Sequence, residues 1–284
     1  MSMKKIKIKI KAFTNKILDF YFNDEDYIKL FWFNGTKNFG DLLNPVLLKE
    51  LTGKKIKFVK PKYYHHTNFL AVGSILDVAS KDSIVWGSGF INDEKKCYQT
   101  PKKICAVRGP KTREVLLSQG IDCPEVYGDP GLLLPMIYNP KKEKKYKLGI
   151  IPHYVDKNNP WLSQFESDEN IKIIDIQNEN VFAFIDEVLS CEKIASSSLH
   201  GIITADAYSI PSLWLEFSDR VVGNGFKFLD YFLSVNRIDS KPLIIKDDTD
   251  ISKLYSSFYD YKIDIDLNKL LKAAPFTIKN TFKF

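Results

Sequence analysis

The sequence predicts an α/β protein built from two Rossmann-like domains. It has 284 residues, and a single hydrophobic core tends to divide above about 250 residues. Short apolar runs alternate with helical segments in both halves, which is typical of parallel sheets with helices on both faces. A charged stretch at 139–147 (NPKKEKKYK) separates the two series. We therefore expect domains over residues 1–143 and 144–284, with a ligand site in the cleft between the carboxyl ends of their sheets.

The first half contains five expected strands and two expected helices. A turn at 36–41 (TKNFGD) leads into a helix at 42–53, which ends at Gly53. A second helix, at 110–120, has Pro110 in its first turn and Gly120 at its end, where these residues are favoured. Apolar runs of strand length lie at 30–35, 55–60, 68–76, 83–90 and 102–109.

The second half repeats this alternation. Helical patterns at 181–190 and 199–210 each follow an apolar run, and the second ends before Pro211. The expected strands lie at 147–155, 172–177, 192–198 and 212–217. The second half therefore also predicts a layered domain with a parallel sheet.

The composition is that of a globular protein, with 44% apolar and 27% charged residues. No apolar run reaches the roughly 18 residues of a membrane span, and the first residues lack the apolar region of a signal peptide, so we expect a cytoplasmic protein. The four cysteines are widely spaced with no C-x-x-C, so we expect free thiols rather than a zinc site.

The net charge of +6 is concentrated at the two ends of the chain. The first 22 residues carry six Lys against one Asp, and the tail contains Lys269, Lys272, Lys279 and Lys283. One interpretation is a reversible peripheral contact with an anionic membrane. The other is that Ile6, Ile8 and Ile10 form an edge strand whose Lys neighbours are solvated. We expect no nucleic-acid partner.

Two of the strand-to-helix turns are candidates for acceptor or loop contacts. Asn38, Gly40 and Asp41 open the first helix, where glycine permits close approach and backbone amides can meet an anion. Ser88 and Gly89 follow a strand that ends in Val85 and Trp86. Neither turn matches G-x-G-x-x-G, so each is a weak signal by itself.

Two further turns carry charged groups. Arg108 ends a strand beside a helix start, which suits a carboxylate or phosphate ligand and equally suits a structural salt bridge. His200 opens a helix after Ser198 and Leu199, and its imidazole has the ordinary pKa best suited to proton transfer near neutrality. His153 is a further candidate cleft residue.

Other kinds of site have little support in the sequence. There is no G-x-S-x-G, and Asp129 and Asp206 are the candidates for orienting another group, although the turn around Asp129 favours a capping role. There is no H-E-x-x-H or other cluster of ligands at metal spacing, so we expect metal-independent chemistry without a bound cofactor.

Seven segments in order resemble the polysaccharide pyruvyl transferase family, and most closely its succinoglycan-type exopolysaccharide branch. The resemblance covers about 30–237, and its carriers are NFGDLLNPVLLKELTG, IVWGSGF, VRGPKTREVLL, VYGDPGLLLP, LGIIPHYVDK, SSSLHGIITADAYSIPSLWLEFSD and GFKFLDYF. It implies a fold similar to two-domain (GT-B) glycosyltransferases, with the active site between the domains and a final segment that returns to the first. It also implies transfer of the pyruvyl group of phosphoenolpyruvate (PEP) onto two sugar hydroxyls as a cyclic ketal, with release of phosphate.

The resemblance also implies roles for individual residues. His200 falls on the catalytic His of an L-H-G motif, and Arg108, Ser198, Leu199 and Lys227 fall on donor-binding positions, with Arg220 as a competitor for Lys227. One departure is Ser198, where several members have Arg. The implied partners are PEP and a sugar acceptor, expected to be a lipid-linked oligosaccharide facing the N-terminal domain and the aromatics near Trp86. A glycosyltransferase that uses a nucleotide sugar and a non-catalytic carbohydrate- or membrane-binding scaffold remain as alternatives.

Overall fold

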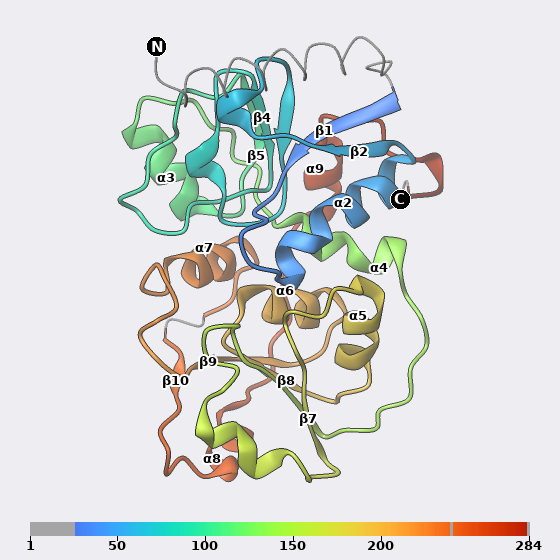
Figure 1. The fold of residues 1–284 in the computed structure, drawn as a ribbon, viewed down its shortest axis with the longest axis vertical. Coiled ribbons are helices and arrows are strands. Elements are labelled where there is room, and N and C mark those ends of the chain that lie inside the picture. Colours follow the sequence, from blue (N-terminus) through green and yellow to red (C-terminus); the bar gives the residue numbers. More distant parts are fainter. Residues whose placement is uncertain (1–25, 239–240, 283–284) are drawn as a thin grey trace, which may run out of the picture.

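The fold was analysed in a computed structural model that describes residues 26–238 and 241–282. The described chain forms two parallel five-stranded sheets stacked end to end (Figure 1). We call the part around the first sheet the first lobe and the part around the second sheet the second lobe. The N-terminal alternation of Ile6, Ile8 and Ile10 lies outside the described residues.

The first sheet has the strand order β2-β1-β3-β4-β5, and every pairing is parallel. Its strands are β1 (Tyr27–Phe31), β2 (Lys55–Phe58), β3 (Asn68–Leu70), β4 (Ser83–Trp86) and β5 (Lys103–Ala106). The second sheet has the order β10-β9-β8-β6-β7 and is also parallel. Its strands are β6 (Leu148–Ile151), β7 (Ile171–Ile173), β8 (Ile194–Ser196), β9 (Ser212–Glu216) and β10 (Leu243–Ile244).

Counted within its own sheet, each lobe has the arrangement 2-1-3-4-5. In open sheets of this kind the strand order reverses between strands 1 and 3, and ligands bind at the carboxyl ends of those two strands. The expectation of an α/β protein with two parallel sheets is confirmed. Both sheets place their reversal point, β1/β3 and β6/β8, at the boundary between the lobes.

Four helices, α2, α3, α5 and α6, occupy the segments that the sequence predicts, with shifted boundaries, and the other described helices were not predicted from the sequence. The described helices are α2 (Phe39–Thr52), α3 (Pro110–Ser118), α4 (Leu134–Ile137), α5 (Val181–Leu189), α6 (Leu199–Ala207), α7 (Phe226–Ser234), α8 (Ile251–Ser257) and α9 (Leu267–Lys272). Short 3₁₀ turns are η2 (Pro61–Tyr63), η3 (Leu76–Val78), η4 (Pro130–Leu133), η5 (Pro160–Phe165) and η6 (Asn280–Phe282). Helix α2 begins three residues earlier than predicted, because Asn38 caps it by accepting from the Gly40 amide. It ends as predicted at Gly53, whose φ of 74° favours glycine.

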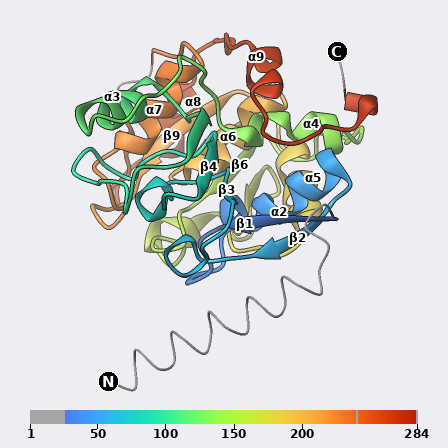
Figure 2. The ribbon, with the colours of Figure 1, turned by 90° about the horizontal axis from the view of Figure 1, so that it is seen from above.

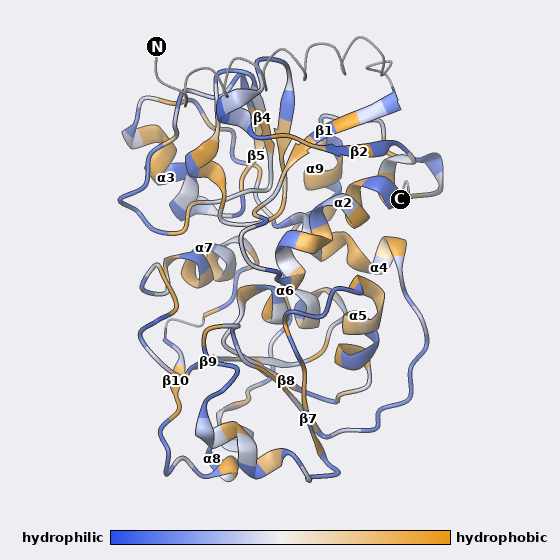
Figure 3. Cartoon of the chain, in the orientation of Figure 1, coloured by the Kyte–Doolittle hydropathy of each residue, from blue (hydrophilic) through white to orange (hydrophobic). Residues whose placement is uncertain are grey.

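The hydrophobic core includes strand residues on both faces of each sheet. All four residues of β6 and all three of β8 are buried, which is why these strands are continuous apolar runs instead of alternating ones. Figure 3 shows hydrophobic residues along the strands and on the helices between the sheets. All four cysteines lie among the described residues and are free thiols, as expected.

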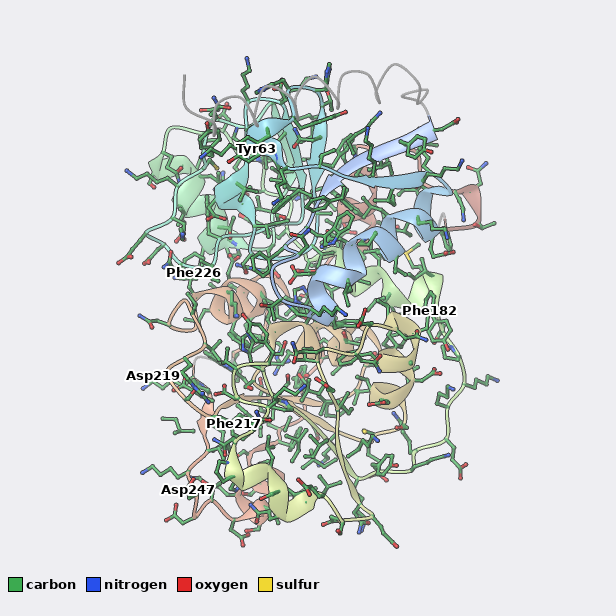
Figure 4. All side chains as sticks on the ribbon, in the orientation of Figure 1. Tyr63, Phe182, Phe217, Asp219, Phe226 and Asp247 are labelled. Atoms are coloured by element: carbon green, nitrogen blue, oxygen red, sulfur yellow. The ribbon has the colours of Figure 1, made fainter. Side chains whose placement is uncertain are left out.

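Helices from both lobes pack directly against each other at the boundary. Helix α2 packs on α5, α3 on α7 and η4 on α6, and the rings of Phe39 and Phe184 stack with centroids 4.1 Å apart. Phe226 (Figure 4) comes from the second lobe yet belongs to a core cluster otherwise made of first-lobe residues. Burial of shared apolar surface therefore fixes how the two lobes meet.

The C-terminal segment lies against the first lobe (Figures 1 and 2). The Trp86 indole donates to the Leu270 carbonyl at 2.9 Å, and the Lys279 amide donates to Leu51 O at 2.9 Å. Phe276 packs its ring against Phe69, with centroids 4.7 Å apart. Among the described residues no helix is both long enough and apolar enough to cross a bilayer.

Candidate functional site

A pocket of about 430 Å³ lies between the lobes at the carboxyl ends of both sheets. Most of its wall comes from the segments that follow β1, β3, β6 and β8, and the rest comes from the loop after β4 and from the region around the start of α7. Strands β1, β3, β6 and β8 are those on either side of the reversal point in each sheet. The pocket therefore occupies the place where open α/β sheets bind their ligands.

The pocket brings together six of the ten residues that the sequence singles out. From the first lobe come Asn38 and Asp41, and from the second come Ser198, Leu199, His200 and Lys227. Gly40 lies directly behind His200. Arg108, Ser88 and Gly89 do not line it.

His200 is held between the two lobes. It stands in the first turn of α6, and its side chain is 12% exposed. A Cβ atom on Gly40 would lie 2.1 Å from His200 Nδ1, so only glycine leaves room for the ring against α2. The sequence predicts that Gly40 admits a ligand to the backbone. The structure instead fills that space with the imidazole.

Asp129 faces the other nitrogen of this ring. Its Oδ2 lies 3.6 Å from His200 Nε2, and its side chain is fully buried. Its Oδ1 accepts the Gly131 amide at 2.8 Å and caps η4. From the sequence, Asp129 is a candidate for orienting another group but the cap is favoured, since a Gly-Asp-Pro-Gly turn cannot reveal which side chain lies opposite the second oxygen.

Asp41 is a buried carboxylate on the first-lobe side of the pocket. Burial raises its pKa to about 6, while His200 and the side chain of Asn38 act in the opposite direction. Asn38 Nδ2 donates to Asp41 Oδ2 at 2.7 Å. This carboxylate can therefore exchange a proton near neutral pH.

The start of α2 is not an anion site, contrary to the prediction. All four of its first amides are already bonded within the protein: Phe39 N to Ile176 O, Gly40 N to Asn38 Oδ1, and Asp41 N and Leu42 N to Asn38 O. The carbonyl of Ile176 comes from the second lobe, so this helix start serves to join the lobes.

The start of α6 differs from that of α2. Within the described chain no acceptor is bonded to the amides of Leu199 and His200, and the Ser198 hydroxyl makes no hydrogen bond. All three residues line the pocket. Amides at a helix start are favourable partners for an anion, and here they open onto a cavity.

Lys227 supplies a positive charge to the same pocket. It follows Gly225, whose φ of 77° starts α7, and it has no ion-pair partner among the described residues. Burial, together with the nearby Arg108, lowers its pKa to about 8, and Asp41 opposes the shift. The competitor Arg220 lies outside the pocket, is 57% exposed and pairs with Asp156 at 2.9 Å.

Arg108 is a structural salt bridge, which was one of the two readings that the sequence left open. It is fully buried, and its Nε lies 2.9 Å from Asp230 Oδ2 on α7. Its Nη1 donates to Ser74 and its Nη2 to the Phe90 carbonyl. The guanidinium therefore joins the lobes and supports Ser74, which lines the pocket.

The expected acceptor contacts at Ser88 and Gly89 belong to this buried network. The Ser88 hydroxyl donates to the Ala71 carbonyl, and a Cβ on Gly89 would lie 2.5 Å from the Arg108 guanidinium. Trp86 is buried and bonded to the C-terminal segment, so it does not face the pocket either. Glycine in this turn admits an arginine rather than a ligand.

Two other candidates are also settled by their surroundings. Asp206 is buried and accepts from Arg237, Tyr231 and Tyr261, which makes it the centre of a structural network. His153 lines the pocket, and burial with the nearby Lys227 lowers its pKa to about 3. A neutral His153 cannot carry a catalytic proton near neutral pH.

Sequence reasoning missed several other residues of the pocket wall. Phe33 from the first lobe and Tyr154 from the second both line the pocket, and Phe33 is 46% exposed. Lys95 also lines the pocket and lies 3.5 Å from Asp77. Position in the loop after β1 could have indicated Phe33, because that loop also carries Asn38. In the described part of the chain no cluster of His, Cys, Asp or Glu could hold a metal ion.

A pocket with an imidazole, a carboxylate and an amine at the reversal points of two parallel sheets is typical of α/β enzymes. A model of the polysaccharide pyruvyl transferase family matches residues 5–219. The chain therefore belongs to the polysaccharide pyruvyl transferase family, a family of transferases, as the sequence predicts.

Two further proteins are similar to this chain. An uncharacterized protein of Acanthamoeba polyphaga mimivirus is 34% identical over 218 residues, which cover 75% of each chain. The crystal structure of an uncharacterized protein from Klebsiella pneumoniae covers 87% of this chain and 100% of that one, with 14% identity and a TM-score of 0.45. The second likeness is too low to carry an argument.

Proposed function

We propose that this protein transfers the pyruvyl group of PEP onto two hydroxyls of a sugar, forms a cyclic ketal and releases phosphate. The observation that carries the proposal is the presence of His200, Lys227 and the open start of α6 in one interlobe pocket. Family membership supports pyruvylation in polysaccharide biosynthesis. Within the family, assignment to the succinoglycan-type branch stays a prediction.

The donor side of the pocket fits a molecule with two anionic groups. PEP carries a carboxylate and a phosphate, which need cations and hydrogen-bond donors. Lys227 and the amides of Leu199 and His200 supply them, and the Ser198 hydroxyl adds another donor. This set takes the place of the Arg that several family members have at position 198. Arg108 acts on the donor through its charge and through Ser74, not by direct contact.

The chemistry requires one group that both donates and accepts protons. His200 gives a proton to the methylene carbon of PEP, so that the adjacent carbon becomes electrophilic, and a sugar hydroxyl adds to that carbon. The His200 ring takes the proton of that hydroxyl. The C–O bond to phosphate then breaks, the second hydroxyl adds, and its proton leaves with the phosphate. Lys227 and the α6 amides offset the charge on the departing group.

The acceptor side fits a sugar. Phe33 and Tyr154 offer aromatic faces to the apolar side of a pyranose ring, and Asp41 with Asn38 offers hydrogen bonds to its hydroxyls. The acceptor is a lipid-linked oligosaccharide, and the Lys-rich first 22 residues hold the protein reversibly at an anionic membrane on the cytoplasmic side. No metal or cofactor takes part.

The proposal is tested by incubating the full chain with PEP and extracted lipid-linked saccharides. We expect phosphate release and a product heavier by one pyruvyl ketal, unchanged by EDTA and lost in a folded His200→Ala variant by about 10²–10⁴-fold. PEP should also raise the melting temperature. Stabilisation by a nucleotide sugar and not by PEP would assign the pocket to a glycosyltransferase instead.

A further inference from the structure

We infer that Asp129 is a positioning residue that holds His200 through Nε2, so that Nδ1 is the nitrogen that moves protons in the pocket. The inference rests on the proposed function, because it assigns an atom to the acid–base step. It adds a residue outside the pocket wall and a defined tautomer of the imidazole.

The first observation is a pair of buried polar atoms that face each other. His200 Nε2 and Asp129 Oδ2 are both buried, and within the described chain neither has a hydrogen-bond partner. They lie 3.6 Å apart. A buried polar atom left unpaired destabilises the folded protein, so two such atoms at this separation are each other's natural partner. Catalytic hydrogen bonds are often long before a substrate binds and shorten in the complex.

The second observation is that the carboxylate is rigidly held. Its other oxygen accepts the Gly131 amide at 2.8 Å. The turn before it is fixed by Gly128, whose φ of 135° is outside the range that other residues adopt readily. A Cβ on Gly87 would lie 2.2 Å from Pro130, so the residue that follows β4 packs tightly against the same turn. Oδ2 can therefore not swing away from the imidazole without breaking the η4 cap.

The third observation concerns the opposite edge of the ring. His200 Nδ1 packs against Gly40 in the first turn of α2 and makes no hydrogen bond within the described chain. Nε2 is one of the buried atoms without a partner, whereas Nδ1, which also has no partner, is not among them, so Nδ1 keeps some exposure. A neutral imidazole has one N–H and one lone pair. Asp129 favours the N–H on Nε2, which leaves the lone pair on Nδ1.

This arrangement sets the route of each proton. Nδ1 accepts the proton of the sugar hydroxyl, and the resulting imidazolium donates from Nδ1 to the methylene carbon of the next PEP molecule. Asp129 holds the ring throughout and stabilises its positive charge. Asp41 directly follows Gly40, which contacts Nδ1, and it lines the same pocket as His200.

The test compares Asp129→Asn with a matched control. Asn keeps the size of the side chain and can keep the cap through its oxygen, but it removes the charge. We expect kcat to fall by about 10²–10⁴-fold with the KM for PEP changed by less than about threefold. Asp250→Asn is the matched control, because Asp250 caps α8 in the same way, at 2.8 Å from the Ser252 amide, far from the pocket. It should leave kcat unchanged.

A pH profile separates positioning from a purely structural role. The charged or titratable groups around His200 are Asp129 before η4, Asp41 on α2, Lys227 on α7 and His153 after β6. Loss of the Asp129 charge makes the imidazolium that protonates PEP less favourable, so the basic limb of the kcat profile should move to lower pH.

A nitrogen NMR measurement tests the inference without turnover. In ¹⁵N-histidine protein, the His200 signals, assigned by their absence from His200→Ala, should show the Nε2–H tautomer in the wild type. The Asp129→Asn variant should lose that preference. An Nδ1–H tautomer in the wild type, or Asp129→Asn with kcat within about threefold of wild type, would overturn the inference. Failure of pyruvyl transfer in the wild type would overturn the proposed function and leave the tautomer result standing.

Discussion

Gly40→Ala should remove activity by displacing His200 while leaving the fold intact. A Cβ at this position would lie 2.1 Å from Nδ1 and 2.5 Å from Cε1, where ordinary contact begins at 3.4 Å. The imidazole would have to retreat by about 1 Å or more. It cannot retreat freely, because Asp129 lies 3.6 Å from the ring on its other side.

The size of the effect follows from that displacement. Misplacement of a reacting group by about 1 Å costs on the order of 10²-fold in rate, which corresponds to about 2.7 kcal/mol of transition-state stabilisation. The free energy of unfolding should change little. Ala is favoured over Gly inside a helix by about 0.5–1 kcal/mol. The gain offsets part of the steric cost.

A double-mutant cycle makes the prediction specific. Steady-state kinetics and thermal melting would be measured for Gly40→Ala, for His200→Ala and for both together. In the His200→Ala background the added methyl meets no ring, so Gly40→Ala should then become neutral or stabilising. A Gly40→Ala enzyme with kcat within about twofold of wild type would refute the argument that glycine is there to admit the imidazole.

Three other perturbations test the electrostatics. Arg108→Ala leaves the Asp230 carboxylate buried without its cation. The protein should therefore lose about 3–5 kcal/mol of stability in denaturant melts. A stable variant with only a raised KM for PEP would instead place Arg108 in direct contact with the donor. Lys227 loses its charge as the pH rises through its pKa of about 8, so the KM for PEP should increase at higher pH. The Lys227→Arg variant stays charged and should not show this increase. Deletion of residues 1–22 should remove salt-sensitive co-sedimentation with anionic vesicles, since each Lys near such a surface contributes about 1 kcal/mol of binding free energy. Equal binding by the full-length and the truncated protein would favour the solvated-strand interpretation.

Much of the fold could be predicted from the sequence because its signals are local. The strand at 148–151 is buried on both faces and therefore reads as an unbroken apolar run. Helix α3 starts at Pro110 as predicted, since a proline tolerates the first helical position. The start of α2 was misplaced by three residues because the cap at Asn38 depends on a side-chain hydrogen bond, which the apolar pattern does not record.

The site could be predicted only in part, because its residues meet across the lobes. The turn at His200 and the amine of Lys227 were expected at the pocket, and both line it. Arg108 has the same local signature as a ligand-binding arginine, and only the structure reveals that its partner is Asp230, 122 positions further along the chain. Glycines carry a similar ambiguity: Gly40 and Gly89 both permit close approach, but of a histidine and an arginine from this chain rather than of a ligand.

Contacts between the lobes therefore decide the chemistry of the site. A Cβ on Gly109 would lie 1.9 Å from the Asp230 carbonyl, and one on Gly223 would lie 2.1 Å from the Ile91 carbonyl, so backbone from each lobe closes on the other at two places. With the lobes fixed this way, α2 delivers Gly40 to one edge of the imidazole and η4 delivers Asp129 to the other. The ring itself belongs to the second lobe. Any movement that separates the lobes would strip the imidazole of both supports at once, so the acid–base group is complete only when the lobes are closed around it.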